Sequence, residues 1–286
     1  GMFKTATNFN DYFGNMKVGE LFRQPELAQT LERIAAKGVS EFYQGKTADL
    51  LVAQMQADKG LITKQDLQDY KAVWREPMAV SWRGNVVYTA PPPSSGGVAL
   101  AQLLGIKEDR AADFKGVAHN SAQYIHLLAE IEKRVFADRA DYLGDPAFTQ
   151  VPVDKLVAKD YLAKRAAQVN PKAISDTDKV KPGLEPHQTT HFSIVDKHGN
   201  AVSNTYTLNL DYGSGVVVKG AGFLLNDEMD DFSAKPGAAN AFGVVGGDAN
   251  AIEPGKRMLS SMSPSLMTRD GKVELVIGTP GGSRIF

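Results

Sequence analysis

The chain has 286 residues, of which 43% are hydrophobic and 23% are charged, and this composition excludes disordered and collagen-like classes. Its 32 basic and 33 acidic residues give a net charge of -1, so no overall field attracts nucleic acid or an anionic membrane. The absence of cysteine excludes disulfides, thiolate metal sites and a cysteine nucleophile.

The five histidines show no zinc-binding spacing, so we expect no metal and no other cofactor. No apolar run approaches the roughly 18 residues that a membrane-spanning helix needs. Gly1 before Met2 resembles a remnant of recombinant expression, so the missing signal-peptide pattern leaves export open.

The N-terminal part, to about Ala72, has the pattern of short helices. Pro25 suits a first helical turn and Gly38 suits a helix exit. Thr63 with Asp66 three positions later predicts the N-cap of another short helix. Residues 78–88 then predict a β-hairpin.

Two segments follow with opposite character. Residues 91–97 contain three prolines and two glycines, which predicts a structured loop or a linker and excludes a helix or a central strand. Residues 121–142 carry apolar side chains at helical spacing and predict the longest helix. A polar stretch over residues 168–188 predicts an exposed loop or linker.

The remaining sequence has β character. Strands are expected at residues 190–195, 201–208, 213–218 and 273–277. A helix-rich part followed by a strand-rich part indicates a layered α+β domain rather than alternating βαβ units.

Thr189 lies where the polar stretch meets the first strand. Taken alone, a threonine there is an ordinary strand former. An N-terminal threonine is also a nucleophile, because its own α-amine, with a pKa near ~8, can accept the hydroxyl proton. Such an enzyme must first cut its own chain, here by attack on the carbonyl of Gln188.

The sequence Thr-Thr-His-Phe-Ser at residues 189–193 closely resembles the start of the small subunit of γ-glutamyltranspeptidases. Further segments resemble that family in the same order along the chain: 91–97, 138–146, 205–209, 224–232, 246–250, 260–264 and 280–284. The resemblance implies an α+β fold of the N-terminal-nucleophile hydrolase type, a four-layer αββα sandwich. It also implies that residues 1–188 are the C-terminal part of a large-subunit region and residues 189–286 the N-terminal part of a small-subunit region.

The resemblance assigns the catalytic groups. Thr189 matches the nucleophile, and Thr207 matches a second threonine whose hydroxyl orients it. Gly281 and Gly282 match the oxyanion hole, where backbone N–H groups stabilise the tetrahedral intermediate.

The resemblance also assigns the substrate-binding groups. Asn209, Glu228 and Asp231 match positions that hold the α-ammonium group, whereas Ser260 and Ser261 match positions that hold the α-carboxylate. The acidic residues alone would be an ordinary solvated turn, and they lack the spacing of a calcium loop.

Two departures from the family pattern stand out. Phe242, in the lid segment of residues 236–247, occupies a position where a tyrosine is common. No arginine of this chain matches the family's upstream arginine that pairs with the substrate carboxylate. We therefore expect a fragment that lacks both ends of the family's sequence.

The activity expected from the resemblance is transfer or hydrolysis of γ-glutamyl groups from glutathione and related compounds through a γ-glutamyl-threonine ester. The acceptor would be water, an amino acid or a dipeptide, and the two subunits would remain paired after cleavage. Relatives suggest a periplasmic or secreted full-length protein. Two alternatives stay open: an acylase of the glutaryl, cephalosporin or polyglutamate type, and a non-catalytic unprocessed fragment.

Overall fold

A computed structural model of the chain describes residues 7–175, 190–235 and 246–281. It divides into two compact units: Gly1–Trp74 with Leu208–Asp227, and Arg75–Thr207 with Glu228–Phe286. The division runs through both of the regions that we expect to be subunits, so the compact units and the predicted subunits are different partitions of the chain.

The first unit is built from short helices: α1 (Phe9–Phe13), α2 (Pro25–Lys37), α3 (Ser40–Tyr43), α4 (Lys46–Ala57) and α5 (Lys64–Asp69). The expected helix signals are confirmed. Pro25 opens α2, Gly38 ends it with a φ of 72°, and Thr63 forms a capping box with Asp66 at the start of α5.

The core of the first unit joins its helices to a distant segment. Ala48, Leu51 and Met55 of α4 pack with Val218 and Ala221. Burial of these apolar side chains attaches the second segment of the unit to the helices.

The prediction of a strand at residues 213–218 was wrong. The structure has only an isolated bridge between Val217 and Leu224 there. Gly213 and Gly215 have φ of 54° and 71°, and this left-handed backbone interrupts an extended run. The main chain of Val217 instead exchanges two hydrogen bonds of 2.9 Å with the Asn8 side chain.

The second unit contains an antiparallel sheet of order β1-β2-β5-β6, made of Met78–Trp82, Asn85–Thr89, Ser265–Arg269 and Lys272–Ile277. The predicted hairpin is confirmed as β1 and β2. Strand β5 has no counterpart in our predictions. It pairs with both β2 and β6, so it joins residues on either side of position 189 in one sheet.

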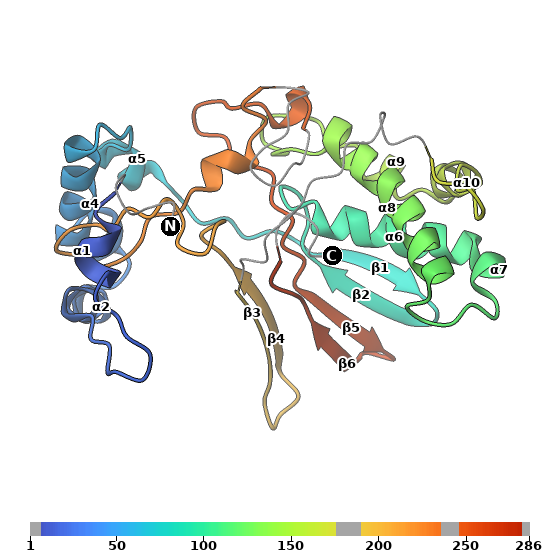
Figure 1. Cartoon of the computed structure of the whole chain (residues 1–286), viewed down its shortest axis with the longest axis horizontal. Helices are drawn as coiled ribbons and strands as arrows, with labels where there is room; N and C mark the ends of the chain where they lie inside the picture. The colour runs from blue at the N-terminus through green and yellow to red at the C-terminus, as the bar shows by residue number, and fades with distance from the viewer. Residues whose placement is uncertain (1–6, 176–189, 236–245, 282–286) are drawn as a thin grey trace. The chain divides into compact units, whose positions relative to one another are not determined.

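Helices cover one face of this sheet, as Figure 1 shows for α6 (Gly96–Asp109) and α8 (Ala122–Tyr142). Three shorter helices accompany them: α7 (Ala111–Phe114), α9 (Val153–Leu156) and α10 (Lys159–Ala167). The long helix predicted at residues 121–142 is confirmed, with Ser121 as its N-cap. Ile106, Ile131 and Leu162 contribute to the core between α6, α8 and α10.

The expectation for residues 91–97 was partly wrong, because α6 begins at Gly96. A Cβ added to Gly97 would lie 2.2 Å from the Ala90 carbonyl oxygen, and one added to Gly96 would lie 2.6 Å from the Ser263 Cβ. The glycines therefore allow close contact between the helix start and its neighbours.

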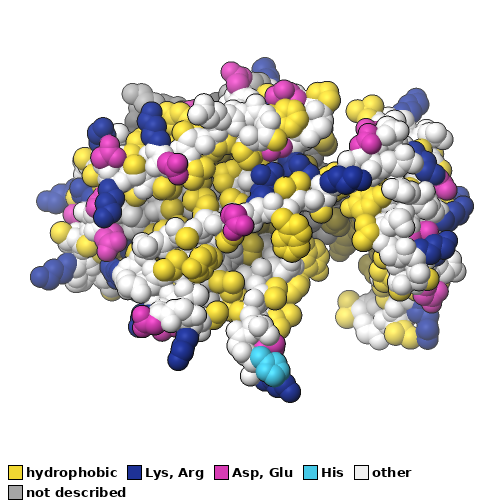
Figure 2. Space-filling view, turned by 180° about the vertical axis from the view of Figure 1, so that it is seen from behind, with side chains coloured by type: hydrophobic (Ala, Val, Ile, Leu, Met, Phe, Trp, Pro, Cys, Tyr) yellow, Lys and Arg dark blue, Asp and Glu magenta, His cyan; other side chains and the backbone are white. Residues whose placement is uncertain are grey.

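A second, two-stranded sheet consists of β3 (Thr190–Val195) and β4 (Ala201–Tyr206). The Ser203 hydroxyl attaches it to the larger sheet, since it donates to the Ile277 carbonyl at 3.0 Å and accepts from the Ser265 amide at 3.0 Å. Exposed apolar side chains lie on β3, β4 and β6: Phe192, Ile194, Val195, Val202, Tyr206, Val273, Leu275 and Ile277. Figure 2 shows the projecting hairpin with yellow side chains around its base.

Candidate functional site

The nucleophile and one glycine of the expected site, Thr189 and Gly282, lie outside the described residues, as does Phe242 of the lid segment. Thr190 begins β3, and Thr207 directly follows β4. In the antiparallel ladder Thr190 pairs with Tyr206. Gly281, which is partly buried, is the last described residue and follows β6 by four positions.

His191 is a polar group of β3 that our sequence reasoning did not assign to the site. Its Nδ1 lies 2.8 Å from the Thr205 hydroxyl and its Nε2 lies 3.0 Å from the Ser193 hydroxyl. Gly278 packs against the ring, because a Cβ there would lie 2.3 Å from the His191 Cε1. Both ring nitrogens are thus engaged, and the imidazole is fixed two residues after the expected nucleophile.

The two serines expected to hold the carboxylate, Ser260 and Ser261, lie beside the loop that precedes α6. The Ser95 amide donates to the Ser260 carbonyl at 2.7 Å, and the Ser95 hydroxyl donates to the same oxygen at 2.9 Å. The Ser260 amide in turn donates to the Pro93 carbonyl at 2.9 Å. Ser94 donates from its hydroxyl to the Met262 carbonyl at 2.5 Å. We call residues 93–95 and 260–262 the serine clamp.

A buried arginine completes the serine clamp. Arg139 is 5% exposed and donates from Nε to the Ser95 hydroxyl at 3.1 Å and from Nη2 to the Ser261 hydroxyl at 3.0 Å. Since the Ser261 oxygen accepts from the guanidinium, its own proton is directed elsewhere and can be donated to an anion. The sequence carries a signal for this role, because Arg139 continues the apolar stripe of Ile131 and Val135 at four-residue spacing.

Asp138, the neighbour of Arg139 on α8, belongs to a separate polar network. Its carboxylate accepts hydrogen bonds from Gln102 at 2.8 Å, Tyr161 at 2.8 Å and Arg165 at 2.6 Å. Burial, followed by the bond to Asp138, raises the pKa of Tyr161 to about 12. These bonds hold α10 against the end of α8 that carries Arg139.

Glu130 fixes the other half of α8. It accepts from Lys133 at 2.6 Å, from Arg134 at 2.7 Å and from the Ser175 amide at 3.1 Å and hydroxyl. Burial opposes ionisation, but these bonds outweigh it and lower the pKa of Glu130 to about 2. The carboxylate therefore stays charged at neutral pH and attaches residue 175 to the helix.

The residues expected to hold the ammonium group belong to different compact units. Glu228 and Asp231 form the 3₁₀ turn η2 (Glu228–Asp231) of the second unit, and both are partly exposed. Asn209 belongs to the first unit, is 8% exposed, and donates to the Asp227 carbonyl at 3.3 Å. Its φ of 75° is a left-handed conformation that asparagine tolerates better than most residues.

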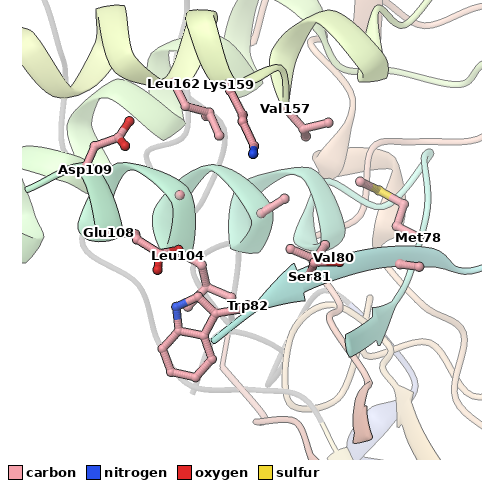
Figure 3. Close-up of a pocket in the computed structure, with 13 residues that line it drawn as sticks. Met78, Val80, Ser81, Trp82, Leu104, Glu108, Asp109, Val157, Lys159 and Leu162 are labelled. Carbon is pink, nitrogen blue, oxygen red and sulfur yellow. The ribbon is translucent and has the colours of Figure 1, made fainter. Parts of the chain in front are cut away.

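A cavity of about 440 Å³ lies apart from all these residues, between β1, α6 and the start of α10. Figure 3 shows Met78, Val80, Trp82, Leu104 and Leu162 around it, with Lys159 reaching from α10 toward α6. None of the predicted site residues lines it. Within the part of the chain that the structure describes, no group of three histidine or acidic side chains is placed to hold a metal ion.

The gamma-glutamyltranspeptidase family matches residues 2–286. A glutathione hydrolase proenzyme of Pseudomonas aeruginosa is 80% identical over 285 residues, which cover 100% of this chain and 51% of the relative. The chain thus spans about half the length of the curated relatives that it matches.

Two solved structures are similar to the chain. A γ-glutamyltranspeptidase from Pseudomonas nitroreducens complexed with L-DON has a TM-score of 0.61 and 69% identity over 63% of this chain and 53% of that one. A cephalosporin acylase from Bacillus halodurans has a TM-score of 0.76 and 26% identity over 96% of this chain and 48% of that one. The fold is therefore the α+β, αββα type of the N-terminal-nucleophile hydrolases, as expected. No described helix is long and apolar enough to cross a membrane.

Proposed function

The chain belongs to the γ-glutamyltranspeptidase family, and we propose that it forms the part of such an enzyme that carries the nucleophile and the γ-glutamyl pocket. The enzyme would transfer or hydrolyse γ-glutamyl groups of glutathione and related compounds. The observation that carries this proposal is the serine clamp, in which a buried guanidinium and a main-chain amide hold two consecutive hydroxyls.

The clamp suits a carboxylate. Ser260 accepts at its hydroxyl oxygen from the Met262 amide at 3.1 Å, and Ser261 accepts from Arg139 at 3.0 Å. Each hydroxyl keeps one proton to donate, and two adjacent donors match the two oxygens of a carboxylate. The nearby guanidinium adds a favourable field without binding the substrate directly.

The ladder of β3 and β4 supports the catalytic assignment. The ladder ends with Thr190 opposite Tyr206, and Thr207 directly follows Tyr206. Thr207 therefore lies beside the strand end that is adjacent in sequence to position 189. This supports Thr207 as the group that orients Thr189.

The proposed reaction begins when the Thr189 hydroxyl attacks the γ-amide carbonyl and its proton passes to the Thr189 α-amine. The amine then protonates the departing amine, and a γ-glutamyl ester remains on Thr189. Water, an amino acid or a dipeptide attacks the ester and restores the free hydroxyl. Backbone N–H groups of Gly281 and Gly282 would stabilise the oxyanion in both steps, each by roughly 3 kcal/mol.

Glu228, Asp231 and Asn209 are proposed to hold the ammonium group, since carboxylate and amide oxygens are suitable acceptors for it. The relatives are named as proenzymes, which supports the proposal that this chain cleaves itself between residues 188 and 189. We further propose that the two resulting subunits stay paired, and that the full-length protein is periplasmic or secreted.

Intact mass spectrometry of the purified chain after incubation near neutral pH tests the proposal. Two fragments separated between Gln188 and Thr189 are expected, together with release of p-nitroaniline from γ-glutamyl-p-nitroanilide. Thr189→Ala should abolish both. An uncut chain would instead favour the non-catalytic, unprocessed alternative.

An acylase is the second candidate, and the similarity to the cephalosporin acylase structure is the observation in its favour. The two functions differ in the headgroup, because a glutaryl group has no ammonium. Faster turnover of glutaryl than of γ-glutamyl anilide would overturn the first proposal in favour of the acylase.

A further inference from the structure

Asn250 lies between two segments that the proposed function assigns to substrate binding. It belongs to the 3₁₀ turn η3 (Asp248–Asn250) and is 3% exposed. Its Nδ2 donates to the Asp231 carbonyl at 2.7 Å, and its Oδ1 accepts from the Leu259 amide at 3.0 Å. One side chain therefore connects the main chain of Asp231 with the residue that precedes Ser260.

The surroundings make this connection rigid. The Ser233 amide donates to the Asn250 carbonyl at 2.9 Å, and Ser233 forms a parallel bridge with Ala251. Leu259 is 1% exposed and packs with Val98 and Leu143 in the core. Hydrogen bonds in such a setting are strong, and loss of one partner leaves the other buried without a substitute.

The chemistry of the connection is specific to an asparagine. The side chain must donate at one end and accept at the other, over a fixed distance. An aspartate can accept from the Leu259 amide but cannot donate to the Asp231 carbonyl, and a leucine can do neither.

We propose that Asn250 is a positioning residue that sets the separation between the ammonium-binding turn at Glu228 and Asp231 and the carboxylate-binding pair at Ser260 and Ser261. This inference rests on the proposed function. Both charges of the substrate headgroup are attached to the same α-carbon, so they can be held together only if the two segments keep a fixed spacing. Asn250 thereby favours binding of a headgroup that carries both the α-ammonium and the α-carboxylate over binding of one that carries only one of them.

The test compares L-glutamate with two ligands that each carry one half of the headgroup. Glutarate keeps the carboxylate that corresponds to the α-carboxylate and lacks the ammonium, whereas 4-aminobutanoate keeps the ammonium and lacks the α-carboxylate. Binding to the whole chain is followed by NMR chemical shifts, well below the unfolding temperature of each variant. Asn250→Asp and the uncharged Asn250→Ser should each lower the affinity for L-glutamate about 10-fold. Each should lower the affinity for glutarate and for 4-aminobutanoate less than about 3-fold.

Ser233→Ala is the matched control. The Ser233 hydroxyl is buried next to Asn250 and has no hydrogen-bond partner among the described residues, so its removal should leave all three affinities unchanged.

The outcomes separate the inference from the proposed function. Failure of the unsubstituted chain to bind L-glutamate would overturn the proposed function and this inference with it. The inference alone would be overturned if substitution of Asn250 left the affinity for L-glutamate unchanged. It would also be overturned if the affinities for all three ligands fell by the same factor.

Discussion

The serine clamp and the β3–β4 hairpin lie in the same compact unit but differ in how they are stabilised. In the clamp, Ser95 is fully buried and Arg139 is 5% exposed, and hydrogen bonds between distant segments join residues 93–95 and Arg139 to residues 260–262. On the hairpin, Ile194 and Val195 are 55% and 57% exposed, and the ladder between two adjacent strands is the main connection. The segment that we propose to bind substrate is therefore held by long-range contacts, whereas the strand that follows the expected nucleophile depends on local pairing.

The largest loss of stability should come from substitution of Arg139 in the serine clamp. Arg139→Met removes the donor for two buried hydroxyls and leaves both oxygens without that partner, so we expect a loss of about 3 kcal/mol in the free energy of unfolding. Urea denaturation followed by circular dichroism measures it. A loss below about 1 kcal/mol would show that the clamp is no more firmly held than the hairpin.

Glu130 should give the next largest effect and a distinctive pH dependence. Its folded-state pKa of about 2 is below the ordinary value of 4.5, so its contribution to stability is complete above about pH 5 and disappears as the pH falls toward 2. Glu130→Gln should cost about 2 kcal/mol at pH 7 and progressively less at lower pH.

Urea midpoints of both chains between pH 7 and pH 3 test this prediction. The two stability curves should converge on acidification. Parallel curves would mean that Glu130 contributes packing but no charge-dependent stabilisation.

A smaller loss of stability is expected from substitution of a single serine in the serine clamp. Ser95→Ala removes the hydroxyl that accepts from Arg139 and should cost about 1.5 kcal/mol, with weaker L-glutamate binding. Ser94→Ala, one residue earlier, removes a bond to the Met262 carbonyl and should lower stability similarly while weakening that affinity less than Ser95→Ala does. Thermal unfolding and NMR titration distinguish the two. Equal affinity losses would contradict a specific role of Ser95.

The smallest effect should come from the hairpin. Ile194→Thr keeps a β-branched side chain on an exposed position, so stability should change by less than about 0.5 kcal/mol. Because the replacement removes apolar surface, self-association measured by analytical ultracentrifugation should decrease. A loss above about 1.5 kcal/mol would indicate that Ile194 is buried in solution.

The elements that the sequence predicted are those with local signals. Pro25, Gly38, the Thr63–Asp66 capping box and the stripe of α8 each act within a few residues. Helix α6 and strand β5 escaped prediction, and the strand at residues 213–218 does not form, because glycine conformation and long-range pairing decide these segments.

The candidate site shows the same contrast between local sequence signals and long-range contacts. Resemblance to the family predicts roles for Ser260 and Ser261, but several of their hydrogen bonds are made with partners more than 100 residues away, such as Ser95 and Arg139. No local sequence pattern predicts such long-range contacts. The sequence around Asn250 likewise indicates only an ordinary turn residue. All of the site assignments stay predictions, and Thr189 and Gly282 lie outside the described residues.

The pairing of β2 with β5 has a consequence for a chain cut between residues 188 and 189. Val86–Thr268 and Thr89–Ser265 are partners in the same ladder, and each pair joins residues on opposite sides of that bond. The two pieces would copurify as one particle and separate only on denaturation. Folding of the nicked protein would then be bimolecular, so its apparent melting temperature would rise with protein concentration, whereas that of the uncut chain would not.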